Sequence, residues 1–219
     1  MPVPASVANS PATSSRVVRR RNRKVADIVA TAAEVLAERG YHDTSLDEIA
    51  DRLDIAKATL YHYFPSKESL VMACMEAVGT EVIQQLSIIA SDKPGTARDR
   101  LAALIQAQLD LVVHKYPQIA TLFRQPLDWP QAYRERIREL QRDHYAIFRS
   151  VVREGIESGE FIVGDEVTTM HNLFGAMNYV PVWFRPKRKK DFTQMSQAVV
   201  DSLLRLFQPA GPASGSPPS

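Results

Sequence analysis

The chain has 219 residues, of which 45% are hydrophobic and 24% are charged, a composition that excludes disordered and fibrous proteins and suits one or two compact domains. No run of about 18 apolar residues occurs, and the single cysteine, Cys74, excludes an intrachain disulfide and a multi-cysteine zinc cluster. The net charge is only +2, so a nucleic-acid partner would require a local concentration of positive charge. The sequence predicts no metal, no cofactor and no membrane segment.

Both ends of the chain are rich in Pro, Ser, Ala and Gly and nearly free of large apolar side chains. Residues 1–15 and 208–219 are therefore predicted to be a disordered leader and a disordered tail, because they bury too little surface to offset the entropy of ordering. The N-terminal stretch lacks the apolar core of a secretory signal, which favours a cytoplasmic protein. An Arg- and Ser-rich transit peptide is the alternative.

A strongly basic segment follows the leader, with six Arg or Lys residues between positions 16 and 24 and no acidic residue before Asp27. One interpretation is an arm that lies along DNA phosphates or enters a minor groove. The other is a solvated leader that keeps the protein in solution. The sequence leaves both interpretations open.

Between the two ends, apolar residues recur with a period of 3.6 and no strand pattern occurs. The sequence therefore predicts an all-α protein with an N-terminal three-helix domain and a C-terminal helical domain. Nine helices are expected, at about 25–39, 45–53, 57–64, 67–90, 96–115, 117–124, 130–158, 165–184 and 191–207.

The two short helices at 45–53 and 57–64 form a predicted helix-turn-helix within a DNA-binding domain at 16–66. Ser45 and Glu48 have the spacing of a capping box at the start of the first helix. Apolar residues at 49, 50, 53, 60 and 64 would anchor both helices from behind. The second helix would then present Lys57, Ala58, Thr59, Tyr61 and His62 to a major groove, since small residues near its start allow the backbone to approach base edges.

These residues carry a resemblance to a known family. Thr44-Ser45-Leu46-x-x-Ile49-Ala50 and Leu60-Tyr61-His62-Tyr63-Phe64-Pro65-Ser66-Lys67-Glu68-x-Leu70 closely resemble the DNA-binding signature of the TetR family of bacterial transcriptional regulators. The resemblance implies that Thr44, Tyr61, His62 and Lys67 hold phosphates, whereas Lys57 and Thr59 approach bases. The expected DNA-binding set is Thr44, Ser45, Lys57, Ala58, Thr59, Tyr61, His62 and Lys67.

The motif departs from the family pattern at two positions. Asp54 stands where the family has a turn glycine, so it must adopt a left-handed conformation, which Asp tolerates better than most residues. Ala56 stands where the family has a capping serine, and the missing cap is typically worth about 1 kcal/mol.

The last helix is apolar over a wider arc than one protomer's core normally needs. Two stripes, Met195, Val199, Leu203, Leu206 and Val200, Leu204, Phe207, lie side by side, and Gly175-Ala176 of the preceding helix permits close helix approach. We expect a homodimer formed by four helices, with Gly175, Met195, Val199, Leu203 and Leu206 in its interface. An ordinary buried helix pair is the alternative.

Polar residues on apolar faces predict a cavity in the 67–207 domain, and the resemblance to the TetR family implies that the central helices there enclose an effector pocket. The expected lining residues are Gln108, His114, His144, Phe148, His171, Phe174, Asn178 and Trp183. For each of them, a satisfied core residue or a surface group is the alternative.

The segment Phe174-Gly175-Ala176-Met177-Asn178 with Trp183-Phe184-Arg185-Pro186 resembles TetR-type regulators of acyl-CoA and lipid catabolism. This resemblance implies an acyl-CoA thioester as the effector. The four basic residues at 187–190 could meet the CoA phosphates, although such runs are more often solvated.

The sequence therefore predicts a ligand-responsive repressor that binds a palindromic DNA operator as a homodimer. A small apolar or amphipathic effector would tilt the 67–90 helix, change the spacing of the two recognition helices and release the DNA. The alternatives are a non-transcriptional DNA-binding factor on the same fold and an all-α enzyme. No catalytic motif occurs, and no catalytic residue is predicted.

Overall fold

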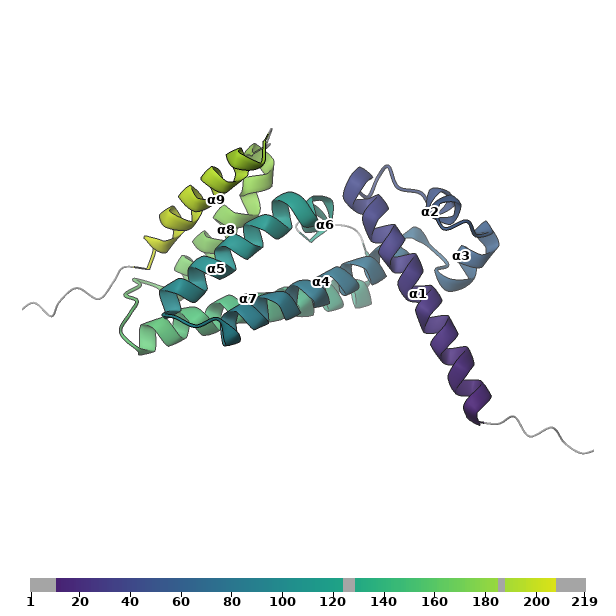
Figure 1. Cartoon of the computed structure of the whole chain (residues 1–219), viewed down its shortest axis with the longest axis horizontal. Helices are drawn as coiled ribbons and strands as arrows, with labels where there is room; N and C mark the ends of the chain where they lie inside the picture. The colour runs from purple at the N-terminus through teal and green to yellow at the C-terminus, as the bar shows by residue number, and fades with distance from the viewer. Residues whose placement is uncertain (1–10, 124–128, 185–187, 208–219) are drawn as a thin grey trace, which may run out of the picture. The chain divides into compact units, whose positions relative to one another are not determined.

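The computed structural model describes residues 11–123, 129–184 and 188–207, and these residues are helical almost throughout. Within the described ranges there are nine α-helices, one short π-helix and no β-strand (Figure 1). The predicted all-α class is confirmed. Contacts between Cα atoms divide the chain into two compact units, Met1–Cys74 and Met75–Ser219, and the division falls within one helix, α4 (Lys67–Asp92).

The first unit contains α1 (Pro11–Arg39), α2 (Leu46–Arg52), α3 (Lys57–Tyr63) and the start of α4. One stripe of α1 is fully buried and forms the centre of this unit. The stripe consists of Ile28, Ala32, Val35 and Leu36, with Val29 at its edge.

The first helix is longer than the sequence predicts. Residues 11–15, expected to belong to a disordered leader, lie in α1. The physical reason is that Pro is well tolerated at the first position of a helix, and neither Pro nor Gly follows before Gly40. Residues 1–10 of the predicted leader and residues 208–219 of the predicted tail lie outside the described residues.

Gly40 ends α1 in the left-handed region, with φ of 78°, and its N–H donates to the Leu36 carbonyl at 2.9 Å. Residues with a Cβ rarely adopt this conformation, which is why Gly marks the end of many helices.

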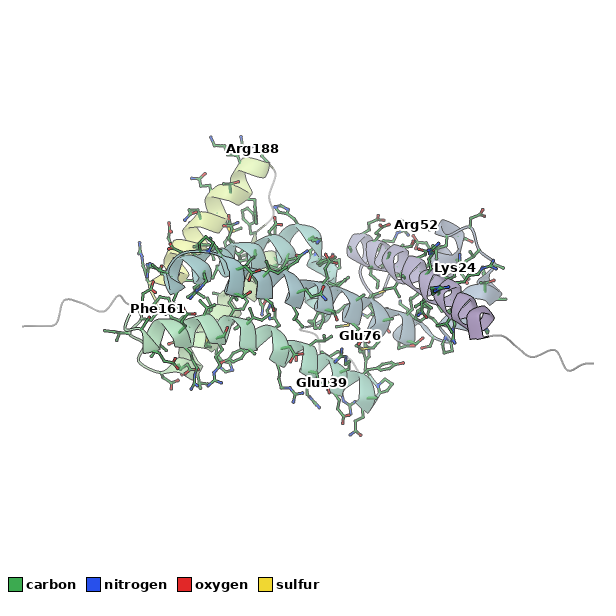
Figure 2. The ribbon with its side chains drawn as sticks, turned by 60° about the horizontal axis from the view of Figure 1, so that its bottom comes forward. Lys24, Arg52, Glu76, Glu139, Phe161 and Arg188 are labelled. Atoms are coloured by element: carbon green, nitrogen blue, oxygen red, sulfur yellow. The ribbon has the colours of Figure 1, made fainter. Side chains whose placement is uncertain are left out.

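The second unit contains the remainder of α4, then α5 (Ala97–Asp110), a π-helix (Leu111–Lys115), α6 (Pro117–Leu122), α7 (Gln131–Glu157), α8 (Glu166–Trp183) and α9 (Lys189–Leu204). Helix α5 lies at the centre and packs against α7, α8 and α9. Its buried residues Leu101, Leu104 and Ile105 belong to one continuous core with Phe148 of α7 and Phe207 after α9. Arg136 of α7 pairs with two carboxylates, Glu76 of α4 and Glu139 of α7, both labelled in Figure 2.

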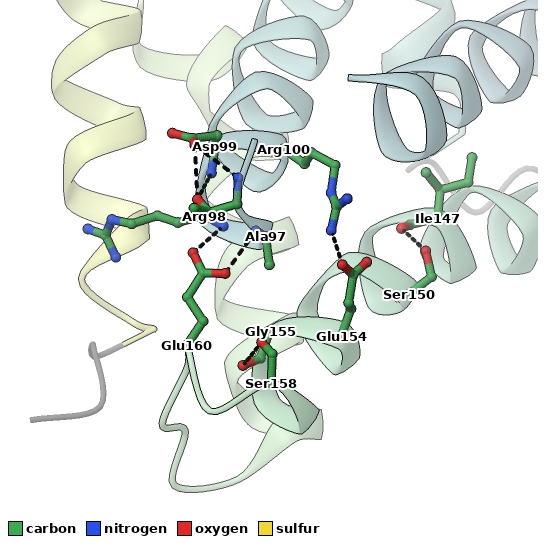
Figure 3. Close-up of polar contacts among 11 residues, drawn as sticks. Ala97, Arg98, Asp99, Arg100, Ile147, Ser150, Glu154, Gly155, Ser158 and Glu160 are labelled. Carbon is green, nitrogen blue, oxygen red and sulfur yellow. Dashed lines mark hydrogen bonds and ion pairs between the residues drawn. The ribbon is translucent and has the colours of Figure 1, made fainter. Parts of the chain in front are cut away.

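The turn after α7 is fastened to the start of α5 by one carboxylate, as Figure 3 shows. The Glu160 side chain accepts hydrogen bonds from the backbone N–H groups of Ala97 and Arg98, both at 2.9 Å. Arg100, one turn further along α5, pairs with Glu154 of α7. The N–H groups of Ala97 and Arg98 have no partner within α5, so the Glu160 carboxylate supplies their hydrogen bonds. Its negative charge is also stabilised by the positive end of the helix dipole.

The predicted helix at 96–115 changes its winding near its end. It is α-helical to Asp110 and then forms the π-helix, in which the Tyr116 N–H donates to the Leu111 carbonyl at 2.8 Å. Such short π segments occur frequently at functional sites.

Candidate nucleic-acid interface and ligand cavity

Helices α2 and α3 form a helix-turn-helix within the first unit. Leu60 of α3 and Ile49 of α2 are almost completely buried, so the two helices are anchored from behind as the sequence predicts. Asp54 in the turn has φ of 50°, which confirms its expected left-handed conformation. Ala56 is the N-cap of α3 and makes no side-chain hydrogen bond there.

The outward face of α3 is open to solvent. Lys57, Ala58, Thr59 and His62 are exposed, and Tyr61 retains 48% of its accessible surface. The first turn therefore presents small side chains flanked by hydrogen-bond donors, which is the shape that a recognition helix needs to enter a major groove.

Asp47 of α2 positions Lys57. Its carboxylate accepts a hydrogen bond from the Lys57 ammonium at 2.6 Å, and this bond raises the pKa of Lys57 above its usual range. Asp47 is absent from the predicted site, because only the folded pair of helices brings it beside the first turn of α3.

The hydroxyl groups of Thr44 and Ser45 are already engaged in holding helix ends. Thr44 is 3% exposed and donates its single hydroxyl proton to the Gly40 carbonyl at 2.7 Å. Ser45 accepts from the Glu48 N–H at 3.1 Å, while the Glu48 carboxylate pairs with Arg39 at 3.0 Å. The Ser45 half of the expected capping box is present, and the Glu48 side chain ties α2 to α1. Both hydroxyls therefore position the helix ends, and the phosphate contact expected of Thr44 stays a prediction.

Lys67 at the start of α4 is held by the segment after α1. Its ammonium lies 4.4 Å from the centre of the Tyr41 ring and donates to the His42 carbonyl at 3.3 Å. Partial burial lowers the pKa of Lys67, and the Tyr41 hydroxyl donates to Glu68 at 3.3 Å. The signature indicated Lys67 but not Tyr41, which fixes its direction.

A cavity of about 160 Å³ lies inside the second unit. This volume is below the usual size of a small-molecule site, so a large ligand would have to widen the cavity. Its walls are mostly apolar and come from α4, α5, the π-helix, α6, α7 and α8. The residues from α4 are Val78, Gly79, Val82 and Ile83; the others are Gln108, Leu111, Val112, Tyr116, Ile119, Ala120, Phe123, Leu140, Gln141, His144 and Asn178.

Two polar side chains that line the cavity, Gln108 and His144, form a pair. Nε2 of His144 lies 2.8 Å from Oε1 of Gln108. Burial lowers the pKa of His144 to about 4, so the imidazole is neutral at pH 7 and donates its Nε2 proton to the amide oxygen. The pair can therefore offer a ligand the amide hydrogens of Gln108 and the Nδ1 lone pair of His144.

Comparison with known families decides the identity of this two-unit chain. Residues 28–74 match the family described as bacterial regulatory proteins of the tetR family, and residues 94–207 match the tetracyclin repressor-like C-terminal domain. The chain belongs to the TetR family. It is a DNA-binding transcriptional regulator.

Relatives of this TetR-family chain match it over most of their length. The fatty acid metabolism regulator protein of Bacillus subtilis (strain 168) is 25% identical over 189 residues, which cover 85% of this chain and 97% of that protein. Two crystal structures are 26% identical and each covers 83% of this chain. One is a TetR/AcrR-family regulator from Thermobifida fusca YX-ER1, with a TM-score of 0.70 and 97% of that chain covered. The other is FadR from Bacillus subtilis in complex with stearoyl-CoA, with a TM-score of 0.67 and 98% of that chain covered.

Three of the eight residues expected in the effector cavity of this TetR-family protein line it, namely Gln108, His144 and Asn178. Phe148 and Phe174 lie behind His144, with ring centres 5.5 and 5.4 Å from the imidazole, and support it from the core side. The other three do not line the cavity, contrary to expectation. His114 packs on Phe192, His171 is exposed with its ring beside the Val167 carbonyl, and Trp183 is 54% exposed.

Sequence reasoning missed the α4 wall and a carboxylate behind it. Glu81 of α4 accepts hydrogen bonds from Lys115 at 2.6 Å and from Tyr116 at 2.9 Å. The π-helix and the cavity residue Tyr116 are thus fastened to α4. Gly79, in the middle of a helix where Gly is unfavourable, was the available signal for a wall on α4. An added Cβ there would lie 3.2 Å from Leu140.

Helices α8 and α9 of the TetR-family protein leave a shallow apolar groove on the surface. It is lined by Ala176, Tyr179, Val180, Trp183, Met195, Ala198, Val199, Ser202 and Leu203. Three of the predicted dimer residues, Met195, Val199 and Leu203, are among them. Gly175 is exposed nearby, and Leu206 is half-buried against the core. Trp183 therefore belongs to this groove and not to the cavity.

Among the described residues, no group of three His, Cys, Asp or Glu side chains could hold a metal ion. No described helix is both long and apolar enough to cross a bilayer.

Proposed function

We propose that this chain is a homodimeric repressor that binds a palindromic operator and is released when an acyl-CoA thioester occupies the cavity of the second unit. The observation that carries the proposal is the double role of α4. Its residues 78–83 contribute to the cavity wall, and the same continuous helix begins inside the DNA-reading unit. A ligand that prefers one position of α4 would shift the protein toward that position, typically by about 1–3 kcal/mol.

The chemistry of the cavity supports an acyl thioester. Its walls are apolar apart from a few amide and imidazole groups, as expected for a site that takes a hydrocarbon chain with one carbonyl oxygen. The amide hydrogens of Gln108 are suitable donors to such an oxygen. The relative FadR binds stearoyl-CoA. Of the basic run at 187–190, residue 187 lies outside the described residues, and Arg188 pairs with Asp191 at 3.0 Å.

The groove between α8 and α9 supports the dimer. Tyr179, Val182 and Trp183 each expose half or more of their surface beside the half-buried Met195 and Val199. Exposed apolar surface of this kind is typical of a protein interface. Two copies joined there would carry two α3 helices related by a two-fold axis, which matches a palindrome.

We assign DNA reading to residues 16–66 together with Lys67 at the start of α4, and effector binding and dimerisation to residues 67–207. The proposed DNA-contacting residues are Thr44, Ser45, Lys57, Ala58, Thr59, Tyr61, His62 and Lys67. We further propose a non-catalytic protein that acts in the cytoplasm. The only cysteine supports the absence of a thiol nucleophile, because burial raises the pKa of Cys74 to about 12.

The test uses a duplex that the protein selects from a random-sequence library. Anisotropy titrations would measure its affinity with and without butyryl-, octanoyl-, palmitoyl- and stearoyl-CoA, with free CoA and free fatty acids as controls. We expect at least one thioester to weaken binding five-fold or more. Ala120→Leu, which fills the cavity from α6, should abolish this response, whereas Ala146→Leu on the exposed side of α7 should keep it. Release by no thioester would overturn the acyl-CoA assignment.

A further inference from the structure

The N-terminal half of α1 concentrates positive charge, whereas the remainder of the chain is net negative. Six of the chain's 27 basic residues lie at positions 16–24, and the preceding residues are uncharged. Without these six, 21 basic residues face 25 acidic ones, so the remainder of the chain has a net charge of −4. A DNA-binding protein whose positive charge is concentrated in one segment depends on that segment for attraction to phosphates.

Helix geometry gathers most of these charges on one side. Successive residues are about 100° apart around an α-helix. Arg19, Arg20, Arg23 and Lys24 therefore occupy an arc of about 140°, roughly opposite the buried stripe that begins at Ile28. We call these four residues the basic face. Arg19, Arg20 and Arg23 are exposed and Lys24 is partly exposed. Figure 1 shows this half of α1 extending beyond α2 and α3.

The basic face differs from two other arginines of the same unit, which form ion pairs. Arg39 pairs with Glu48 at 3.0 Å, and Arg52 pairs with Glu38 at 2.5 Å. Within the described part of the chain, the four side chains of the basic face form no ion pair. Figure 2 labels Lys24 on α1 and Arg52 on α2.

The charges of the basic face also destabilise the N-terminal half of α1. Arg19 with Arg23 and Arg20 with Lys24 are like charges one turn apart, which repel each other. The first turn of α1 contains no acidic residue, and positive charge near a helix N-terminus is unfavourable. A polyanion alongside would neutralise these charges and stabilise the same helix.

We propose that the basic face of α1 is a second DNA-contacting surface, which binds phosphates flanking the bases that α3 reads. The inference rests on the DNA-binding function of the chain, and both surfaces belong to the same compact unit. From Arg19 to Lys24 the helix advances about 8 Å, which spans two to three phosphates of one strand. The contact is to the backbone, so it adds affinity without adding sequence preference.

The test compares two variants that each remove two charges at i, i+4 spacing on an exposed helix. Arg19→Gln/Arg23→Gln changes the basic face, and Arg138→Gln/Arg142→Gln changes α7 in the second unit. Anisotropy titrations from 50 to 300 mM salt would use a 40-bp duplex selected by the protein and a 40-bp random-sequence duplex. Circular dichroism would check that helicity is unchanged.

We expect the basic-face variant to lose ten-fold or more in affinity for both duplexes at 100 mM salt. Its slope of log K against log salt should fall by about 2 to 4, because each lost phosphate contact removes about 0.9 from the slope and a dimer carries two faces. Arg19→Lys/Arg23→Lys should retain the wild-type slope. On a duplex trimmed to the bases read by α3, wild type and basic-face variant should bind alike.

Two results would overturn the proposal. One is an unchanged slope and affinity for Arg19→Gln/Arg23→Gln. The other is an equal loss for the α7 variant, which would assign the effect to net charge alone. A wild-type protein that binds neither duplex would instead contradict the DNA-binding function on which the proposal rests.

Discussion

The front of α3 and the cavity of the second unit differ in how many tasks each side chain performs. On α3 the outward residues are exposed, and the fold depends on other residues, such as Leu60 and Ile49, on the opposite side. In the second unit the cavity wall is also the edge of the core, and residues such as Leu111 and Leu140 serve both. Changes on the first surface should alter binding alone, whereas changes in the second unit should alter stability and binding together.

The largest effect is expected at Ala58, in the first turn of α3. Ala58→Glu places a carboxylate where the helix meets the electronegative duplex, and affinity for the selected duplex should fall 100-fold or more. The fold should be unaffected, because Ala58 is exposed and an acidic residue near a helix N-terminus is favourable. Titrations and chemical unfolding of this variant and of Ala146→Glu on α7 test both statements. A loss of unfolding free energy above about 1 kcal/mol would erase the contrast between the two regions.

A single added methyl group should be costly in the second unit. A Cβ at Gly155 of α7 would lie 2.2 Å from the ring of Phe161, which is 2% exposed and packs in the core. Gly155→Ala should therefore lower the free energy of unfolding by about 2–3 kcal/mol, the upper part of the range for overpacking. Gly164→Ala is the matched control, because nothing lies within 4 Å of its added Cβ. Equal stabilities for the two variants would show that Phe161 and its neighbours move aside for the added methyl group at little energetic cost.

The same contrast explains which parts of the molecule the sequence predicts. The helix-turn-helix follows from local signals, since caps, turn residues and apolar spacing lie within about 25 residues of each other. Asp54 and Ala56 behave as expected for that reason. The cavity is assembled from six elements spread between residues 78 and 178. Gln108 and His144 stand out as polar residues on apolar stripes, but nothing local distinguishes them from His114 or His171.

Other differences arise from partners that only the folded chain supplies. Thr44 belongs to the family motif, and the fold adds a hydrogen bond from its hydroxyl to the Gly40 carbonyl, which the motif does not predict. Asp47 and Glu81 are ordinary surface carboxylates in the sequence and become positioning residues once α2 and α4 are in place. Helix periodicity also gives no sign that the winding changes after Asp110.

Protonation of His144 should lower the stability of the protein, because the imidazole is largely buried in the cavity wall. Its pKa is about 4 in the folded protein and about 6.5 when unfolded, so between these values the unfolded state binds more protons. The free energy of unfolding is therefore highest above pH 6.5 and decreases as the pH falls from 6.5 to 4. By pH 5 it should be lower by about 2 kcal/mol. Chemical unfolding at pH 7.5 and at pH 5 tests this. Between these two pH values, the free energy of unfolding of His144→Gln should fall by about 2 kcal/mol less than that of the wild type. The exposed His171→Gln should keep the wild-type difference, and a His144 variant with that same difference would contradict the assignment.

The smallest effect is expected at Glu81, where the two regions are coupled in the proposed mechanism. Its carboxylate fastens Lys115 and Tyr116, and therefore one wall of the cavity, to α4. Glu81→Gln removes the charge that holds Lys115, so an occupied cavity should move α4 less. We expect operator affinity without effector to stay within two-fold of wild type. The factor by which an acyl-CoA weakens operator binding should be about five-fold smaller than in the wild type. Glu76→Gln is the matched control, because Glu76 also lies on α4 but pairs with Arg136 of α7, outside the cavity lining. Titration of operator release against effector concentration separates the outcomes, since a Glu81 variant with the wild-type response would show that α4 senses the ligand through its own wall residues.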